Sequence, residues 1–175
     1  MKTIVIGGSH AALSLAAELR KLASDAEITI VSADPELPYQ RPPLSKAYMS
    51  GKVTFEQILL RPEDWYAAYT IALIRGLRAE RIDRTAREVE LSDGRRLAYD
   101  RLVLATGARP RRLPAEIGGM LPNVHVMRDL SDAHQLMERM KEGARLVVIG
   151  GGYIGLEAAS EAAKRGVAVT VIEAA

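Results

Sequence analysis

The chain has 175 residues, of which 48% are hydrophobic, and its formal net charge is +2. The absence of cysteine excludes disulfides, thiolate metal sites and thiol redox centres, and the three histidines are scattered, so no metal site is predicted. The apolar runs are too short to span a membrane, no signal peptide is visible and only 5% of the residues are aromatic, so we expect a cytoplasmic protein that binds neither membrane nor nucleic acid.

A glycine turn follows the first apolar run. A strand is predicted over 3–6, a helix from the glycine turn to about residue 22, and a second strand over 28–31. The helix is expected to bury Leu13, Ala16, Ala17, Leu19 and Leu22. Gly7 has the first place of a G-x-G-x-x-G pattern, with Ser9 and Ala12 at the second and third. Alanine is accepted at the third place, whereas Ser9 adds a Cβ where a phosphate would approach, so this turn alone leaves dinucleotide binding open.

An acidic residue and a proline-rich loop come next. Asp34 can accept hydrogen bonds from an adenosine ribose, or it can be a polar turn residue, and both interpretations stay open. Four prolines between residues 35 and 45 stiffen the loop, and Ser45 is expected to cap a short helix that begins at Lys46. Arg41 and Lys46 are cations on this loop, which on their own indicate only solvated surface charge.

The middle of the chain changes to strand-like alternation. A partly helical stretch is predicted over 53–69, a strand over 71–74 and a later strand over 100–104. Alternation between residues 79 and 104, with a turn at Asp93 and Gly94, predicts an antiparallel β-meander. Thr106 and Gly107 follow the last of these strands, and such small residues let a flat ligand or a phosphate lie against the backbone.

A basic, proline-bearing stretch from Arg109 to Pro114 is the candidate domain boundary. We therefore expect a first domain segment over 1–110 and the start of a second, incomplete domain over 111–175. A short strand and a helix are expected next, over 124–127 and 130–140. Ser131 is the expected N-cap of that helix.

A second glycine turn carries the complete fingerprint. A buried parallel strand is predicted over 146–149, a helix over 156–165 and a second apolar strand over 167–172. Gly150 permits a tight turn, Gly152 lets backbone N–H groups approach a pyrophosphate, and Gly155 lets the helix pack closely on the strand. The start of the helix supplies the positive end of its dipole. Glu173, roughly twenty residues after the first glycine, can accept hydrogen bonds from a ribose 2′-OH, which favours NAD over NADP.

Together the two units predict a Rossmann-like, three-layer α/β fold that binds dinucleotides, with a parallel sheet and an inserted antiparallel β-meander. The alternative for each turn is a glycine bend that only packs a helix on a sheet. For the second turn, the two strands, the helix and the terminal acid favour dinucleotide binding over that alternative.

Three stretches of the sequence carry a family resemblance. They are Leu37-Pro-Tyr-Gln-Arg-Pro-Pro-Leu-Ser-Lys-Ala-Tyr48, Leu102-Val-Leu-Ala-Thr-Gly-Ala-Arg109 and Val147-Val-Ile-Gly-Gly-Gly-Tyr-Ile-Gly-Leu-Glu157. In this order they resemble the signature loop, the end of the first flavin-domain segment and the NAD motif of the FAD-dependent pyridine nucleotide oxidoreductases. The loop is typical of the branch that reduces ferredoxin, rubredoxin and putidaredoxin, and the likeness extends over the whole chain.

The resemblance implies an NADH-dependent oxidoreductase with an FAD/NAD(P)-binding fold, which takes hydride from NADH onto FAD and passes electrons to a ferredoxin-type acceptor. The residues it implies for FAD are Gly7, Ser9, Ala11, Ala12, Asp34, Arg41, Lys46, Ala79, Thr106, Gly107 and Arg128. Those it implies for NADH are Gly150, Gly152, Ile154, Gly155 and Glu173. Lys46 and Glu157 are implied as a catalytic pair beside the flavin. The lack of cysteine excludes the branches that reduce disulfides.

Several expectations about assembly and alternatives follow. Members of this branch are much longer, so we expect an N-terminal fragment or a truncated product. A half-built Rossmann unit exposes a strand edge, which we expect to be covered by another copy or by exchanged elements, unless the unit is not ordered. A basic patch at Arg109, Arg111 and Arg112 either steers an acidic ferredoxin or is an ordinary solvated linker. A non-catalytic nucleotide-binding or interaction module stays open, as does another flavin branch, such as the reductase part of nitrite reductase or an apoptosis-inducing-factor-like protein.

Overall fold

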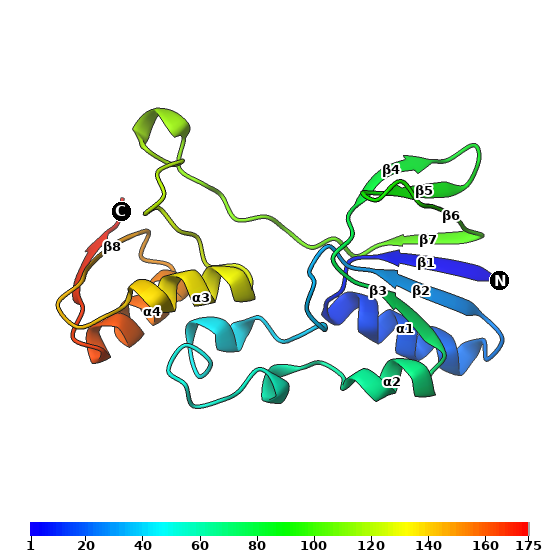
Figure 1. The fold of residues 1–175 in the computed structure, drawn as a ribbon, viewed down its shortest axis with the longest axis horizontal. Helices are drawn as coiled ribbons and strands as arrows, with labels where there is room; N and C mark the ends of the chain where they lie inside the picture. Colours follow the sequence, from blue (N-terminus) through cyan, green and yellow to red (C-terminus); the bar gives the residue numbers. More distant parts are fainter. Residues whose placement is uncertain (175) are drawn as a thin grey trace. The chain divides into compact units, whose positions relative to one another are not determined.

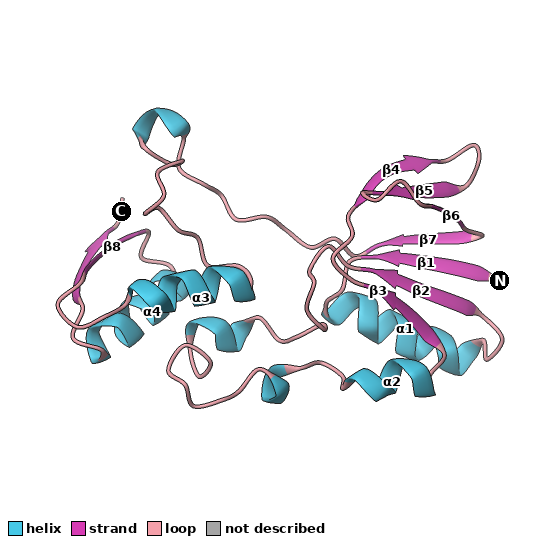
Figure 2. Cartoon of the chain, in the orientation of Figure 1, coloured by secondary structure: helices cyan, strands magenta, loops and turns pink. Residues whose placement is uncertain are grey.

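The structure, a computed structural model, describes residues 1–174. The chain forms two compact units, each of which is described by itself. Unit 1 consists of residues 1–40 and 58–108, and unit 2 consists of residues 41–57 and the residues from 109 onward. Figure 2 shows the helices and strands of both units. The described residues contain no helix that is long and apolar enough to cross a membrane.

Unit 1 is built on a four-stranded parallel sheet. Its strands are β1 (Lys2–Ile6), β2 (Glu27–Val31), β3 (Ile71–Ile74) and β7 (Arg101–Leu104), in the spatial order β3-β2-β1-β7. Every adjacent pair is parallel, with Ile4 opposite Thr29 on one side and opposite Leu102 on the other. Because parallel strands all end at one edge, the loops after β1, β2, β3 and β7 meet there.

Two helices cover one face of this sheet (Figure 1). They are α1 (His10–Leu22) and α2 (Glu63–Ala68). The core between them and the sheet is made by Val5, Ala12, Leu13, Ala16, Ala26, Ile28, Ile30, Tyr66 and Ile71. The expected burial of Leu22 is wrong, since this residue is 85% exposed. It is the last residue of α1, beyond the turns of the helix that pack on the sheet.

The opposite face of the sheet is covered by the predicted meander, which is confirmed. Its strands β4 (Ala79–Asp83), β5 (Glu88–Leu91) and β6 (Arg96–Ala98) form an antiparallel sheet in that order. Val89 and Leu91 pack from it against Ile4, Ile6 and Val31 of the parallel sheet. Unit 1 is therefore three layers deep, as the sequence predicts.

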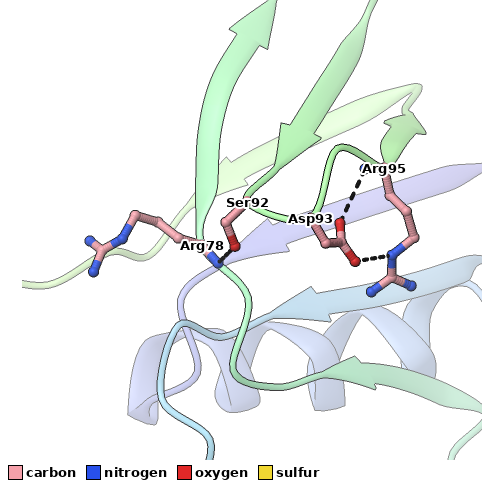
Figure 3. A network of polar contacts seen from close by, with 4 residues as sticks. All are labelled: Arg78, Ser92, Asp93 and Arg95. Atoms are coloured by element: carbon pink, nitrogen blue, oxygen red, sulfur yellow. Dashed lines mark hydrogen bonds and ion pairs between the residues drawn. The ribbon is translucent and has the colours of Figure 1, made fainter.

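The turn between β5 and β6 contains the predicted Asp93–Gly94 pair. Gly94 has φ +84°, a conformation that favours glycine. The carboxylate of Asp93 accepts the backbone N–H of Arg95 at 3.1 Å and its side-chain Nε–H at 2.6 Å (Figure 3). These hydrogen bonds, the backbone one first, lower the pKa of Asp93. The turn chemistry thus fixes the hairpin register locally.

Unit 2 contains a parallel strand pair and two longer helices. Its elements are the 3-10 helices η1 (Pro42–Ser45) and η3 (Ala115–Ile117), the helices α3 (Leu130–Arg139) and α4 (Tyr153–Lys164), and the strands β8 (Arg145–Ile149) and β9 (Ala168–Ile172). A further 3-10 helix, η2 (Glu56–Ile58), lies where the chain returns to unit 1. The core of unit 2 is made by Met49, Leu136, Met140, Ala158, Ala162 and Val167.

Four expectations for unit 2 are wrong. Asp129, not Ser131, caps α3: its carboxylate accepts the N–H of Asp132, whose own carboxylate accepts the N–H of Asp129. Residues 124–127 form no strand, and the N–H of Val124 instead donates to the carbonyl of Leu121 in a turn. Ser45 ends the helix η1 and caps none.

The fourth concerns β8, which was expected to be buried throughout. Val147 and Ile149 are 55% and 61% exposed. Leu146, which alternates with them, packs against the core of unit 2. The alternation arises because this core covers only one face of the strand pair.

Candidate functional site

The first glycine turn joins β1 to α1 at the carboxyl edge of the parallel sheet. Gly7 has φ +116°, and a Cβ placed there would lie 2.1 Å from the carbonyl oxygen of Ala105. Its N–H donates to the carbonyl of Val31 at 2.8 Å. The backbone N of Thr106 would lie 3.2 Å from the same Cβ, so this residue borders the turn as well. Only glycine therefore allows the ends of β1, β2 and β7 to approach one another this closely.

The start of α1 presents backbone amides rather than side chains. Ser9 is the N-cap residue, with φ −141°, but its side chain makes no capping hydrogen bond. The first N–H groups of a helix have no partner within the helix and carry the positive end of its dipole, which is how helix starts bind phosphates. Ala11 is exposed at this start, while Ala12 is fully buried in the core beside Val5. Ala12 thus fills the close-packing role expected of the third place in the fingerprint.

Asp34 lies after β2, within its own turn. One carboxylate oxygen accepts the N–H of Glu36 at 3.2 Å and the other accepts the hydroxyl of Tyr39 at 3.0 Å. The backbone carbonyl of Asp34 accepts the N–H of Gly76 from the loop after β3. These contacts are those of the polar turn residue, one of the two interpretations that the sequence left open. Binding of a ribose by Asp34 remains a prediction.

Two further residues implied for FAD, Ala79 and Gly107, lie in loops and strand starts of unit 1. Ala79 begins β4, and the residue before it, Arg78, exchanges two hydrogen bonds with Ser92. The N–H of Arg78 donates to the Ser92 hydroxyl at 3.1 Å (Figure 3), and its carbonyl accepts the Ser92 N–H at 2.8 Å. Gly107, after β7, has φ +68°. The backbone next to Ala79, one of the residues implied for FAD, is therefore held by the two hydrogen bonds of Arg78.

The second glycine turn joins β8 to α4 in unit 2. Gly150 has φ +103°, and its N–H donates to the carbonyl of Ile172 at 2.8 Å. A Cβ at Gly155 would lie 2.6 Å from the Gly150 carbonyl oxygen, so α4 and β8 approach more closely than any other residue would allow. Gly152 is the N-cap of α4, with φ −70°, no side-chain cap and no atom within 4 Å of a Cβ placed there. The backbone at Gly152 is open on the side that a pyrophosphate would occupy.

Glu173 reaches this turn from the end of β9. Its carboxylate accepts a hydrogen bond from the N–H of Gly151. A Cβ at Gly151 would lie 2.9 Å from the same carboxylate oxygen. Ile154, in the first turn of α4, is 53% exposed. The structure therefore brings together the glycines and the acid that the sequence predicts for NADH, and adds Gly151 to them.

A hydroxyl, an ammonium and a carboxylate meet in unit 2. Glu157, on α4, accepts a hydrogen bond from the Ser45 hydroxyl at 2.6 Å through one oxygen. The Nζ of Lys46 lies 3.1 Å from its other oxygen. In the same loop, the guanidinium of Arg41 donates to the backbone carbonyl of Arg128 at 2.7 Å. Lys46 and Glu157, which the resemblance implies as a pair, are thus in contact, and so are Arg41 and Arg128, which it implies separately for FAD.

These contacts change the acidity of Glu157. The Ser45 hydroxyl is the largest cause that lowers its pKa, followed by the hydrogen bond and charge of Lys46. Glu157 therefore stays ionised to lower pH than an ordinary glutamate. Beside it lies an open cavity of about 420 Å³, whose charged lining residues include Lys46, Lys52 and Glu161.

The arrangement fits dinucleotides better than metals. Each glycine turn sets an uncapped helix start at the carboxyl end of parallel strands, which is the structure that binds a pyrophosphate. Within residues 1–174 no group of three or more His, Cys, Asp or Glu side chains could hold a metal ion. Ser45 and Gly151 are site residues that sequence reasoning missed. Each stands directly beside a residue that it singled out, and only the folded contacts distinguish them.

Comparisons with known proteins agree with this geometry. The profile of the family described as pyridine nucleotide-disulphide oxidoreductase matches residues 1–175. Rhodocoxin reductase of Rhodococcus erythropolis is 45% identical over 174 residues, which are 99% of this chain and 40% of that protein. Putidaredoxin reductase of Pseudomonas putida is 44% identical over 174 residues, or 98% of this chain and 41% of that protein. A crystal structure of the covalent complex of putidaredoxin reductase with putidaredoxin superposes with a TM-score of 0.90 at 44% identity, over 97% of this chain and 41% of the other.

These findings confirm the resemblance to the ferredoxin, rubredoxin and putidaredoxin reductase branch and the α/β fold it implies. The chain spans about 40% of the length of the curated relatives named here.

Proposed function

The chain belongs to the pyridine nucleotide-disulphide oxidoreductase family. We propose that it binds the cofactors of an NADH-dependent flavoprotein that passes electrons to a ferredoxin-type acceptor. FAD and NAD(H) are the proposed cofactors. The observation that carries the proposal is the pair of uncapped helix starts behind Gly7 and Gly152, each at the end of parallel strands. The reactions of the longer relatives are attributed to this chain only as part of this proposal.

We assign the first turn to FAD and the second to NADH. Residues 1–110 are then the first segment of an FAD-binding domain, and residues 111–175 are the start of an NAD-binding domain. In the first turn, the proposed role of Gly7 is to allow the tight bend, and Ser9, Ala11 and Ala12 would offer their backbone amides to a pyrophosphate. Contacts of FAD with Asp34, Ala79, Thr106, Gly107, Arg41, Lys46 and Arg128 are part of the proposal. So are contacts of NADH with Gly150, Gly152, Ile154, Gly155 and Glu173.

The chemistry comes from the cofactor and the electrostatics from the protein. A bound flavin would accept a hydride from NADH and release electrons singly. The chain's own contribution is to hold the pyrophosphates on backbone amides and to keep a positive charge at Lys46 in place through Glu157. An ammonium held in one position stabilises negative charge that develops beside it without further reorganisation.

The proposed acceptor is a small acidic redox protein. A relative of this chain has been crystallised as a covalent complex with putidaredoxin, which supports a ferredoxin-type partner. Arg109, Arg111 and Arg112 form a basic stretch that can steer such a partner. Coverage of the exposed strand edge by a second copy and a cytoplasmic location remain predictions from the sequence.

The test is the absorbance spectrum of the purified protein, supplied with FAD and then titrated anaerobically with NADH. The proposal predicts a yellow protein whose flavin absorbance NADH bleaches. A colourless protein that takes up no FAD would contradict the assignment of the first turn. NADH binding without flavin would favour the alternative, a non-catalytic nucleotide-binding module. The contacts of Asp34 within its own turn support that alternative.

A further inference from the structure

Ser45 is a buried hydroxyl held against a carboxylate far away in the sequence. It is 4% exposed, and its Oγ donates to Oε2 of Glu157 at 2.6 Å. The next residue, Lys46, has its Nζ 3.1 Å from Oε1 of the same carboxylate. Two consecutive residues of one loop therefore divide the two oxygens of Glu157 between them.

The loop holds this hydroxyl in place through its backbone and one anchor. The N–H groups of Lys46 and Tyr48 both donate to the carbonyl of Pro43, at 3.0 and 2.9 Å. Met49 is fully buried in the core of unit 2, and its carbonyl accepts a hydrogen bond from the guanidinium of Arg165. Because the backbone on the C-terminal side of Ser45 is fixed in these ways, its hydroxyl is preorganised rather than recruited.

The two partners of Glu157 differ in environment. The Lys46 side chain is 55% exposed, so solvent screens its ion pair with Glu157. The hydrogen bond from Ser45 is within the short range of hydroxyl-to-carboxylate bonds, which are stronger than neutral ones, and its donor residue is buried. The hydroxyl is thus the better fixed of the two contacts.

We propose that Ser45 is a positioning residue, which holds Glu157 so that the second carboxylate oxygen faces Lys46 and keeps its ammonium in one place. The proposal deepens the proposed function and rests on it for the role of that ammonium beside a flavin. Ser45 itself need not touch a cofactor. Without its hydroxyl, Glu157 has only a solvent-screened partner, and the ammonium loses its fixed position.

The decisive readout is the pKa of Glu157, measured by carbon-13 NMR of its carboxyl group in the 175-residue chain. We expect Ser45→Ala to raise this pKa toward that of an ordinary glutamate and Ser45→Thr, which keeps the hydroxyl, to restore it. Ser50→Ala is the matched control, because its hydroxyl in the same loop donates to the carbonyl of Ala47 at 3.1 Å and its loss is only structural. An unchanged pKa in Ser45→Ala, or an equal rise in Ser50→Ala, would overturn the proposal.

A second variant keeps the test independent of how Ser45→Ala folds. Lys46→Met leaves the serine in place, so the pKa of Glu157 should retain most of its depression. A return to the ordinary value in Lys46→Met would show that the lysine, not the serine, holds the carboxylate. Lys52, Glu161 and Tyr153 also line the cavity beside Glu157, and they are unchanged in every variant compared.

Flavin reduction by NADH separates this proposal from the proposed function. If the protein binds FAD, Ser45→Ala should slow reduction and move the acid limb of its pH profile to higher pH, since Glu157 then protonates at higher pH. Reduction with the wild-type rate and pH profile in Ser45→Ala would count against the positioning role. If the protein binds no FAD, the proposed function fails, whereas the NMR titration still decides whether Ser45 holds Glu157.

Discussion

The carboxylate of Glu173 accepts a hydrogen bond from the backbone N–H of Gly151, in the middle of the second glycine turn. This places negative charge beside the first turn of α4, where the helix dipole favours it. An acid at this position is the group that would accept the hydroxyls of an adenosine ribose. If NADH binds as proposed, its ribose would meet a carboxylate whose Oε2 already accepts the N–H of Gly151.

Replacing this acid by its amide should weaken NADH binding. We expect Glu173→Gln to raise the dissociation constant of NADH by about tenfold, because a hydrogen bond to a charged group is worth roughly 1–2 kcal/mol more than a neutral one. Discrimination against NADPH should fall in the same variant, because the repulsion of its 2′-phosphate is gone. Calorimetric titration measures both, with Glu138→Gln on the exposed side of α3 as control. Equal NADH affinities of wild type and Glu173→Gln would be incompatible with the assigned role.

The close approach at Gly7 predicts a large loss of stability on substitution. Gly7→Ala should lower the free energy of unfolding of unit 1 by about 3 kcal/mol, because the new Cβ would lie 2.1 Å from the Ala105 carbonyl oxygen at a positive φ. Gly94→Ala is the matched control, since Gly94 also has a positive φ but no atom within 4 Å of its Cβ. It should cost only about 1 kcal/mol. Denaturant unfolding compares the two, and similar losses would contradict the packing described for Gly7.

The N-cap of α3 gives a prediction that separates two neighbouring residues. Asp129→Ala should destabilise unit 2 by about 1 kcal/mol, because it removes the acceptor for the N–H of Asp132 at 2.9 Å and breaks the reciprocal capping box. Ser131→Ala, on the exposed side of the same turn, should change the stability by less than about 0.5 kcal/mol. Thermal unfolding of both variants is sufficient, and the opposite ranking would restore Ser131 as the cap.

The docking of the proline-rich loop predicts a core-like response at one methionine. Met49→Ala should cost about 2–4 kcal/mol, because Met49 is fully buried among residues of α3 and α4. Met120, which is 76% exposed, is the control, and Met120→Ala should be nearly neutral. Unfolding free energies from denaturant titration test this. A neutral Met49→Ala would mean that residues 41–57 do not fold with unit 2.

Much of the fold was predictable because its signals are local. The two glycine turns, the β-meander and the acid after β9 each depend on a few adjacent residues, such as Gly7 and the Asp93–Gly94 pair. The family resemblance implies Lys46 and Glu157 as a pair, and the structure brings the two into contact; their catalytic role stays a prediction.

The errors lie where tertiary context decides. Val124 and its neighbours have strand-like composition but no partner strand, and a backbone without a partner does not remain a strand. Ser131 and Asp129 are both good capping residues, and only the position of the first helical turn distinguishes them. The contact of Ser45 with Glu157 joins residues 112 positions apart, which no local pattern predicts.

The central claim is that an uncapped helix start with an open glycine backbone binds the pyrophosphate of a dinucleotide. Gly152→Ala tests it most directly, because Gly152 has φ −70° and open space around its Cβ, so alanine fits there without strain. Calorimetry with NADH should show binding to the wild type and at least about a tenfold weaker affinity in Gly152→Ala, while the unfolding free energies agree within about 1 kcal/mol. Equal affinities, or no NADH binding to the wild type, would contradict the account.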